Sequence, residues 1–416
     1  MHDIALNELW TLVVALLTIS LGSGVIARVP MLARYSIPPA VVGGFLVAVV
    51  LLALQQLGWQ FGFGTLTRSA LLLVFFTTLG LSARLSAMRG GGLAMALMSL
   101  AIALLAIGQN AVGAGVAWAF GEPASLAVFL GSAAFLGGHG TTAAWAGQEL
   151  AASAPDAFDV GMACATLGLV AGGVLGSVVA TKLLDRMPNA PGSGSGSGPA
   201  VAPVHGEVTL HGDQDNALFG RWTSSDRWLR QLLVLSLTIG IALAWQAWLA
   251  GRGINIPAFL ACLLTAVVFT NLADLLKHGV DLKTADLVGT VALRLFLAMS
   301  LMSLDLRTVL DAAALILSAV LLQCLLTALI AVTLVRHAAS IGSDGAERTR
   351  NGAVAAGGFM GFGLGAMPVG LSVMQRITLQ HGAAPRAFLV VTLAASLVQD
   401  LINAGVVQAA LSWAAP

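Results

Sequence analysis

The sequence predicts an all-α polytopic membrane protein with about ten transmembrane helices and two re-entrant hairpins. Of its 416 residues, 58% are apolar and only 9% are charged, and the mean hydropathy is +0.91. Soluble domains carry about 25% charged residues, so this composition excludes an ordinary soluble protein. The net charge of +1 offers no basic surface for nucleic acid, and we expect membrane lipid to be the surrounding partner.

Ten apolar runs have the length of about 20 residues that a membrane-spanning helix needs. They lie near residues 6–27, 38–56, 69–85, 92–119, 160–181, 231–249, 256–276, 287–304, 312–335 and 387–411. No basic region or small-residue cleavage site accompanies the first run, so we expect it to be a retained span rather than a signal peptide. Residues 186–226 include PGSGSGSGPA and are expected to form a flexible cytoplasmic linker.

Two further apolar segments, about 126–147 and 352–375, are long enough to cross but are interrupted by glycine. The first contains FLGGHGTTAAWAG and the second GFGLGAMPVG, in which Pro368 follows three alternating glycines. Broken backbone at membrane depth is tolerated only inside protein or along a watery cavity. We therefore expect both segments to enter and leave the membrane on one side.

The distribution of basic residues supports this topology, because cytoplasmic loops are enriched in Lys and Arg. With the N-terminus outside and both segments re-entrant, the Lys and Arg residues fall on the cytoplasmic side except Arg68, Arg252 and Arg307, which lie outside, and Arg294, which lies within a span. If both segments crossed fully, most basic residues would lie outside. The sequence therefore predicts that both termini are periplasmic.

The two halves resemble each other at an offset of about 220 residues. Ile37-Pro38 opens the second span and Ile256-Pro257 opens the seventh, while LSARL at 81–85 corresponds to MSLDL at 302–306. Each unit, 1–185 and 227–416, has five spans, so the second must be inverted in the bilayer. Glycine-broken segments at corresponding places in inverted halves indicate a transporter's midplane binding site.

Two groups of polar residues are the candidate ligands. Free N–H groups and half-helix N-termini suit an anionic substrate, and the substrate candidates are Gly137, Gly138, His139, Gly140, Thr141, Thr142, Gly361, Gly363, Gly365 and Arg294. The Na⁺ candidates, which offer oxygen atoms within spans, are Asn110, Thr166, Asp400 and Asn403. Arg294, about 10 Å along its span, needs either Asp400 or a substrate carboxylate as its partner. Gln109, Asn110 and Thr166 have interhelical hydrogen bonding as the alternative role.

Several classes of function are disfavoured. Cys164, Cys262 and Cys324 lie in apolar runs without a metal-binding or CxxC spacing, so neither disulfides nor a transition-metal site are expected. His139 has no Ser or Cys at helical spacing, and we expect no enzymatic activity and no cofactor apart from Na⁺ as coupling ion. A channel with two pore loops remains an alternative to a transporter.

The chain resembles the bacterial sodium/glutamate symporter family in both halves. The resemblance rests on GGHGTTAAW (137–145), MACATLGLVAGG (162–173), LFLAMSLMSLDL (295–306), GFGLGAMPVG (361–370), AFLVV (387–391) and QDLINA (399–404). It implies a homodimeric transporter of the inner membrane that couples Na⁺ influx to uptake of L-glutamate. It also implies an elevator mechanism, in which spans four, five, nine and ten move with the hairpins. Another small carboxylate or amino acid is the alternative substrate.

Overall fold

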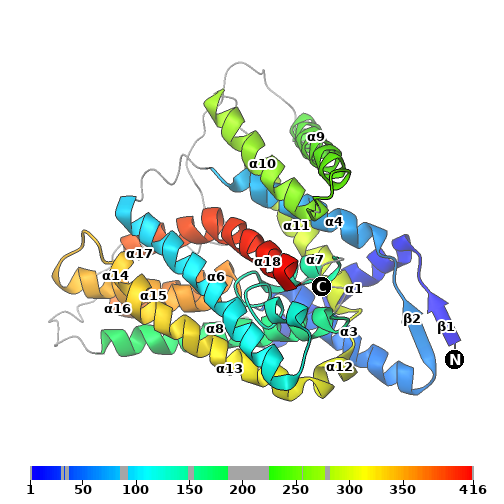
Figure 1. The fold of residues 1–416 in the computed structure, drawn as a ribbon, viewed down its shortest axis with the longest axis horizontal. Helices are drawn as coiled ribbons and strands as arrows, with labels where there is room; N and C mark the ends of the chain where they lie inside the picture. The colour runs from blue at the N-terminus through cyan, green and yellow to red at the C-terminus, as the bar shows by residue number, and fades with distance from the viewer. Residues whose placement is uncertain are drawn as a thin grey trace.

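Helices make up nearly all of the computed structural model (Figure 1). It describes residues 2–29, 32, 37–84, 92–148, 154–185, 224–254, 256–276 and 282–414. The linker expected at 186–226 lies outside the described residues, except for residues 224–226, which begin a helix. Arg34, Arg89, Arg186, Arg221 and Lys277, which were placed in cytoplasmic connections, also lie outside them.

Five long helices belong to the first half of the chain. They are α1 (Glu8–Arg28), α3 (Pro39–Gln56), α4 (Leu66–Ser82), α6 (Gly92–Phe120) and α8 (Ala157–Leu184). Between α6 and α8 lie a short 3-10 helix, η1 (Ala124–Val128), a series of turns, and the nine-residue helix α7 (Gly138–Ala146). The segment expected near 126–147 is therefore not one continuous helix.

The second half is also helical. It contains α9 (Ser224–Ala250), α10 (Ala258–Leu275), α11 (Leu282–Leu301), α12 (Leu306–Asp311), α13 (Ala313–Ile330), η3 (Ala331–Val335), α14 (Arg336–Ala338), α15 (Gly345–Gly363), α16 (Met367–His381), α17 (Pro385–Ala394), η4 (Ala395–Gln399) and α18 (Asp400–Ala414). Both η3 and η4 are π-helical turns that join their neighbours into longer helices, Ala313–Ala338 and Pro385–Ala414.

Within the described ranges, nine helices are long and apolar enough to cross a membrane. The tenth expected span corresponds to α4, which begins and ends three residues earlier than expected and has 17 residues. A helix of this length can still cross the membrane, because spans of about 17 to 25 residues occur. The prediction of a polytopic helical membrane protein is therefore confirmed.

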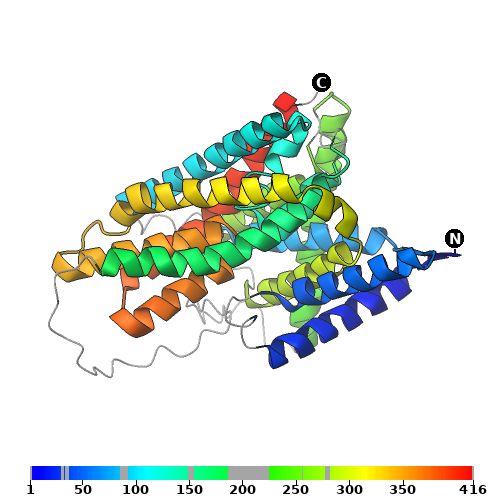
Figure 2. The same cartoon turned by 90° about the horizontal axis from the view of Figure 1, so that it is seen from below.

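The helices pack in two groups. In the first, α4 packs against α10 and α11, while α3 packs against α1 and α11 and α9 against α10. In the second, α6, α8 and α13 pack with η1, α7, α15, α16, α17 and α18. Figures 1 and 2 show α1, α4, α9 and α10 separated from α14, α15, α16 and α17, which lie together on the left. The ring of Trp145 on α7 joins the groups by contacting Phe259 on α10, with a centroid distance of 5.0 Å, and Phe259 in turn contacts Phe76 on α4 at 4.7 Å.

A stripe of glycines allows the closest packing in the second group. Gly168, Gly172 and Gly176 recur every four residues on α8 and so lie on one face of that helix. A Cβ atom at Gly172 would lie 2.9 Å from the Met360 carbonyl oxygen, and one at Gly176 would lie 2.6 Å from that of Gly357. Both carbonyls belong to α15. Small residues therefore bring the backbones of α8 and α15 together, as in other membrane helix pairs.

The two short strands were not expected from the sequence. β1 (His2–Ala5) pairs in parallel with β2 (Trp59–Gly62), with His2 opposite Trp59. Just after β1, the carboxylate of Glu8 accepts hydrogen bonds from the backbone N–H groups of Leu66 and Thr67 at 3.0 and 2.9 Å. A four-residue strand is too short to show an alternating pattern of apolar and polar residues, so it is recognised only by its pairing in the structure.

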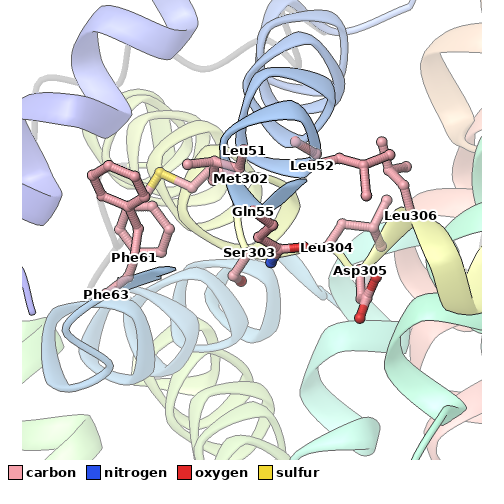
Figure 3. A pocket seen from close by; sticks show the side chains of 11 residues that line it. Leu51, Leu52, Gln55, Phe61, Phe63, Met302, Ser303, Leu304, Asp305 and Leu306 are labelled. Atoms are coloured by element: carbon pink, nitrogen blue, oxygen red, sulfur yellow. The ribbon is translucent and has the colours of Figure 1, made fainter. Parts of the chain in front are cut away.

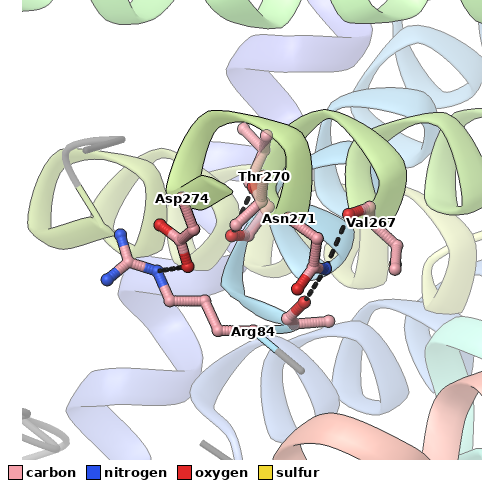
Figure 4. A network of polar contacts seen from close by, with 7 residues as sticks. Arg84, Val267, Thr270, Asn271 and Asp274 are labelled. Atoms are coloured by element: carbon pink, nitrogen blue, oxygen red, sulfur yellow. Dashed lines mark hydrogen bonds and ion pairs between the residues drawn. The ribbon is translucent and has the colours of Figure 1, made fainter. Parts of the chain in front are cut away.

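The other end of α4 is held by side chains of α10 (Figure 4). Thr270 Oγ1 donates to the Leu81 carbonyl at 2.8 Å, and Asn271 Nδ2 donates to the Ala83 carbonyl at 2.9 Å. Arg84 Nε lies 3.4 Å from Asp274 Oδ2. The last carbonyls of a helix have no partner within it, so α10 supplies the hydrogen bonds that α4 cannot make itself.

Replacing Glu8 by alanine is expected to destabilise the fold. The substitution removes the acceptor for two N–H groups in the first turn of α4, which then have no partner within the helix. The melting temperature of the purified protein should therefore fall. Glu122→Ala is the control, because Glu122 is exposed just beyond α6. Equal melting temperatures for the two variants would contradict this role of Glu8.

Candidate functional site

The first broken segment contains a tight turn at the start of α7. Gly138 has a φ of +67°, a left-handed conformation that glycine adopts without the steric cost that a side chain brings. Thr142 Oγ1 lies 2.9 Å from the Gly138 carbonyl and 3.1 Å from the Ala133 carbonyl, and its hydroxyl donates to these oxygens. Thr142 therefore stabilises the turn itself.

The second broken segment consists of two helices, α15 and α16, separated by residues 364–366. Pro368 lacks an N–H group and so cannot donate to the Leu364 carbonyl, which would be its partner in a continuous helix. The non-helical part of this segment is shorter than the glycine pattern indicated, since Gly361 and Gly363 remain within α15. A Cβ at Gly361 would lie 2.6 Å from Gly370 Cα, so Gly361 is where α15 and α16 approach closely.

The two breaks meet inside the protein. A Cβ at Gly138 would lie 2.8 Å from the Gly365 carbonyl oxygen, although the two residues belong to different halves of the chain. A Cβ at Gly137 would lie 2.5 Å from Asn403 Nδ2 on α18. The structure thus brings together Gly137, Gly138, Gly365 and Asn403 from the predicted site. Gly363 faces elsewhere, towards Leu105 and Thr327.

His139 and Thr166, predicted as substrate and Na⁺ ligands respectively, contact each other. His139 Nε2 lies 2.9 Å from Thr166 Oγ1, and the Thr166 hydroxyl donates to the Met162 carbonyl at 2.9 Å. Because that bond uses the single hydroxyl proton, Nε2 of the imidazole must be the donor to Thr166. The Nδ1 atom of the neutral ring is then an acceptor. His139 itself is 6% exposed.

The predicted polar residues within spans differ in their surroundings. Asn110 Oδ1 accepts a hydrogen bond from the Ser132 backbone N–H at 2.8 Å. Asn403 is 1% exposed, and neither its amide oxygen nor its amide nitrogen has a partner among the described residues. Asp400, one turn earlier, is partly buried. Asn403 is therefore the predicted site residue whose side chain is most clearly available to a ligand.

Arg294 does not pair with Asp400. Among the described residues no ion pair joins these two side chains, and Arg294 is exposed on α11. Leu287 and Val291, at helical spacing before it, are exposed on the same face of α11. The pairing of Arg294 with Asp400 that was considered from the sequence is therefore not made, and the pairing with a substrate carboxylate stays a prediction.

Three glutamine side chains donate hydrogen bonds to backbone carbonyls of the broken segments. Of these three, only Gln109 was singled out from the sequence. Gln109 Nε2 donates to the Gly363 carbonyl at 2.8 Å, and Gln399 Nε2 donates to that of Leu136 at 2.7 Å. Gln323 Nε2 donates to the carbonyls of Gln109 and Leu130, both at 2.8 Å. The signal that could have identified Gln323 and Gln399 is a neutral amide within an otherwise apolar span, where a polar group requires a partner.

A cavity of about 220 Å³ lies elsewhere in the molecule (Figure 3). Its lining comes from α3, from β2 and the residues after it, and from residues 302–306, which connect α11 to the start of α12; Gln55, Ser303 and Asp305 are its polar residues. The Asp305 backbone N–H donates to Asp159 Oδ1 at 2.9 Å. None of the predicted site residues lines this cavity.

Comparison with known proteins gives one family. The model of the sodium/glutamate symporter family matches residues 4–383. The sodium/glutamate symporter of Escherichia coli (strain K12) is 33% identical over 406 residues, which cover 97% of both chains. That of Haemophilus influenzae is 32% identical over 402 residues, covering 96% of this chain and 95% of the relative.

Replacing Gly365 by alanine is expected to disturb the meeting point of the two breaks. The new Cβ would lie 2.6 Å from Leu169 Cα, a backbone atom of α8 that cannot move independently. The folded yield and the melting temperature should both fall. Gly405→Ala on α18 is the matched control, since no atom lies within 4 Å of its Cβ position. There the substitution should be neutral or stabilising by up to about 1 kcal/mol. Equal stability of the two variants would rule out the close packing at Gly365.

Proposed function

The chain belongs to the sodium/glutamate symporter family, and on this premise we propose that it couples Na⁺ entry to the uptake of L-glutamate across the bacterial inner membrane. The observation that carries the proposal is the meeting of the two broken segments at Gly138 and Gly365, beside the unpartnered amide of Asn403. Broken helices that meet in the interior are the usual form of a transporter's binding site.

We propose that both broken segments are re-entrant hairpins in two inverted repeats, residues 1–185 and 227–416. Packing supports a two-fold relation: α3 contacts α11, and α10 contacts α4, as expected if α3 corresponds to α10 and α4 to α11. Pro38 and Pro257 are the N-caps of α3 and α10, and both helices have 18 residues. With five spans in each repeat, both termini lie in the periplasm and the linker lies in the cytoplasm.

The proposed substrate site lies where α7 and α16 begin. The N–H groups in the first turn of a helix have no partner within it and favour an anion, so these two helix starts suit the two carboxylates of glutamate. His139 Nδ1, left as an acceptor by the bond to Thr166, suits the α-ammonium group. Gly140 and Thr141 belong to the same turn of α7, and Gly361 and Gly363 act by shaping the end of α15.

For the coupling ion we propose Asp400 and Asn403 as ligands near the substrate. Asn403 Oδ1 is buried and has no partner within the described ranges, and Asp400 would supply negative charge one turn away. Asn110 and Thr166 remain candidates through the second lone pair of each side-chain oxygen. A negative-inside potential opposes the entry of an anion by about 2.3 kcal/mol per 100 mV, so at least two Na⁺ ions are needed to give net inward positive charge.

The two packing groups support an elevator-type movement. In this proposal α6, α8, α13, α17 and α18 move with the hairpins, while α1, α3, α4, α9, α10 and α11 form the static, dimerising part of a homodimer. The contact of Trp145 on α7 with Phe259 on α10 would lie at the sliding surface. An apolar surface suits sliding, because its contacts are not directional.

Uptake by purified protein in liposomes tests the proposed function. An inward Na⁺ gradient should concentrate radiolabelled L-glutamate above its equilibrium level, and an inward choline gradient should not. Uptake of radiolabelled aspartate and malate, measured in the same way, shows whether a different carboxylate is the substrate. Uptake that only equilibrates, whatever the Na⁺ gradient, would indicate the alternative of a channel and would contradict symport.

Arg294→Gln should weaken glutamate binding if the guanidinium contacts a substrate carboxylate. A hydrogen bond to a charged group contributes about 1.5 to 3 kcal/mol, so the half-saturating glutamate concentration should rise about tenfold or more. The melting temperature should stay unchanged, since Arg294 forms no ion pair with another described residue.

The control for this variant is Arg252→Gln. Arg252 is exposed in the turn after α9 and stacks on the Trp248 ring at 3.5 Å, far along the chain from either break. Its substitution should leave the half-saturating glutamate concentration unaltered. If Arg294→Gln behaves in the same way in the uptake assay, Arg294 does not bind the substrate.

A further inference from the structure

Three polar side chains with unused oxygen atoms are connected at the turn of residues 130–132: Ser132 belongs to the turn, and Gln323 Nε2 donates to the carbonyls of both Leu130 and Gln109. Gln109 comes from α6, Ser132 from the turns after η1, and Gln323 from α13. All three residues are 0% exposed. Gln109 Oε1, Ser132 Oγ and Gln323 Oε1 have no hydrogen-bond partner among the described residues. An unsatisfied polar atom in such a position is costly, so something outside the chain should contact these oxygens.

The orientation of both amides is determined by their partners. Gln323 Nε2 donates to the carbonyls of Gln109 and Leu130, and Gln109 Nε2 donates to that of Gly363, all at 2.8 Å. A carbonyl oxygen can only accept, so the nitrogen of each amide must face it. Rotating either amide by half a turn would set oxygen against oxygen. The two Oε1 atoms are therefore genuine free acceptors.

The backbone beside these side chains is also rich in oxygen. A Cβ at Gly131 would lie 2.6 Å from Asn110 Oδ1, 2.8 Å from the Gln109 carbonyl and 2.9 Å from the Ala127 carbonyl. A side chain at this position would collide with these atoms, so the backbone oxygens can lie this close only around a glycine. Asn110 Oδ1 already accepts from the Ser132 N–H, which draws Ser132 into the same cluster.

We propose that Gln109, Ser132 and Gln323 are ligands of a Na⁺ ion bound beside Gly131. This inference rests on the proposed function, in which Na⁺ is the coupling ion. The free atoms are neutral oxygens, which suit a hard cation and repel an anion. No carboxylate belongs to the cluster, which favours a monovalent ion over Ca²⁺ or Mg²⁺, whose sites use carboxylates.

The site would link ion binding to the shape of the substrate site. Gln109 contacts Gly363, two residues before Gly365, while Gln323 contacts Leu130 in the first broken segment. An ion held between these two amides would fix both breaks at once. Substrate binding at Gly138 and Gly365 would then depend on Na⁺ through the positions of the two breaks.

A buried water molecule is the alternative occupant. Water can donate two hydrogen bonds, and Asn110 Nδ2, which also lacks a partner among the described residues, could donate to it. Water and Na⁺ differ in one measurable respect, since only the ion makes the stability of the protein depend on Na⁺ concentration.

The test is the substitution Ser132→Ala, read out by melting temperature as Na⁺ replaces choline, without substrate. Ser132 Oγ has no partner in the part of the chain that the structure describes, so its removal should not lower the melting temperature in choline. If Ser132 ligates Na⁺, the half-saturating Na⁺ concentration should rise about tenfold, which corresponds to about 1.4 kcal/mol. An unchanged half-saturating concentration would overturn the proposed ligand and favour water.

Ser300→Ala is the matched control. Ser300 on α11 is also 0% exposed, and its hydroxyl also lacks a partner among the described residues. This variant should keep the wild-type Na⁺ dependence. If the wild-type protein itself gains no stability from Na⁺ relative to choline, Na⁺ coupling fails together with the site. If Na⁺ stabilises the wild type and both variants equally, only the site beside Gly131 is refuted.

Discussion

Backbone carbonyls released where two helices break are the constraint on which the rest of the structure depends. In an apolar interior each unsatisfied carbonyl or N–H group costs several kcal/mol. The chain meets this requirement with glutamine amides, which bond the carbonyls of Leu130, Leu136 and Gly363. Three long spans therefore each carry a buried glutamine, although every one of these spans would be more hydrophobic with leucine in its place.

The same constraint brings the two halves of the chain together. Glycine at 138 and 365 leaves room for the breaks to touch, and glycines on α8 let α15 approach along its length. Because the amides that support the breaks come from α6, α13 and η4, these helices must accompany the broken segments if the segments move. The proposed division into a moving and a static group thus follows from where the hydrogen bonds are made.

The sequence was sufficient for the spans and for the existence of the breaks, since length, hydropathy and glycine content are local properties. It was not sufficient for the breaks' internal geometry: Gly361 and Gly363 remain helical because their neighbours on α16 and α13 pack against them. The roles of all three glutamines could not be predicted, because the carbonyls that they bond lie 193 to 263 residues away in the sequence. Arg294 and Asp400 were considered as a pair from charge alone, yet α11 and α18 lie in different packing groups.

The central claim is that both broken segments return to the side from which they enter, and single cysteines labelled from one side of the membrane test it most directly. In a background without the three native cysteines, Glu122→Cys and Gln148→Cys flank the first segment. A membrane-impermeant maleimide applied to the periplasmic face should label both positions, and applied to the cytoplasmic face it should label neither. Labelling of the two positions from opposite faces would mean that the segment crosses the membrane, which would contradict the account.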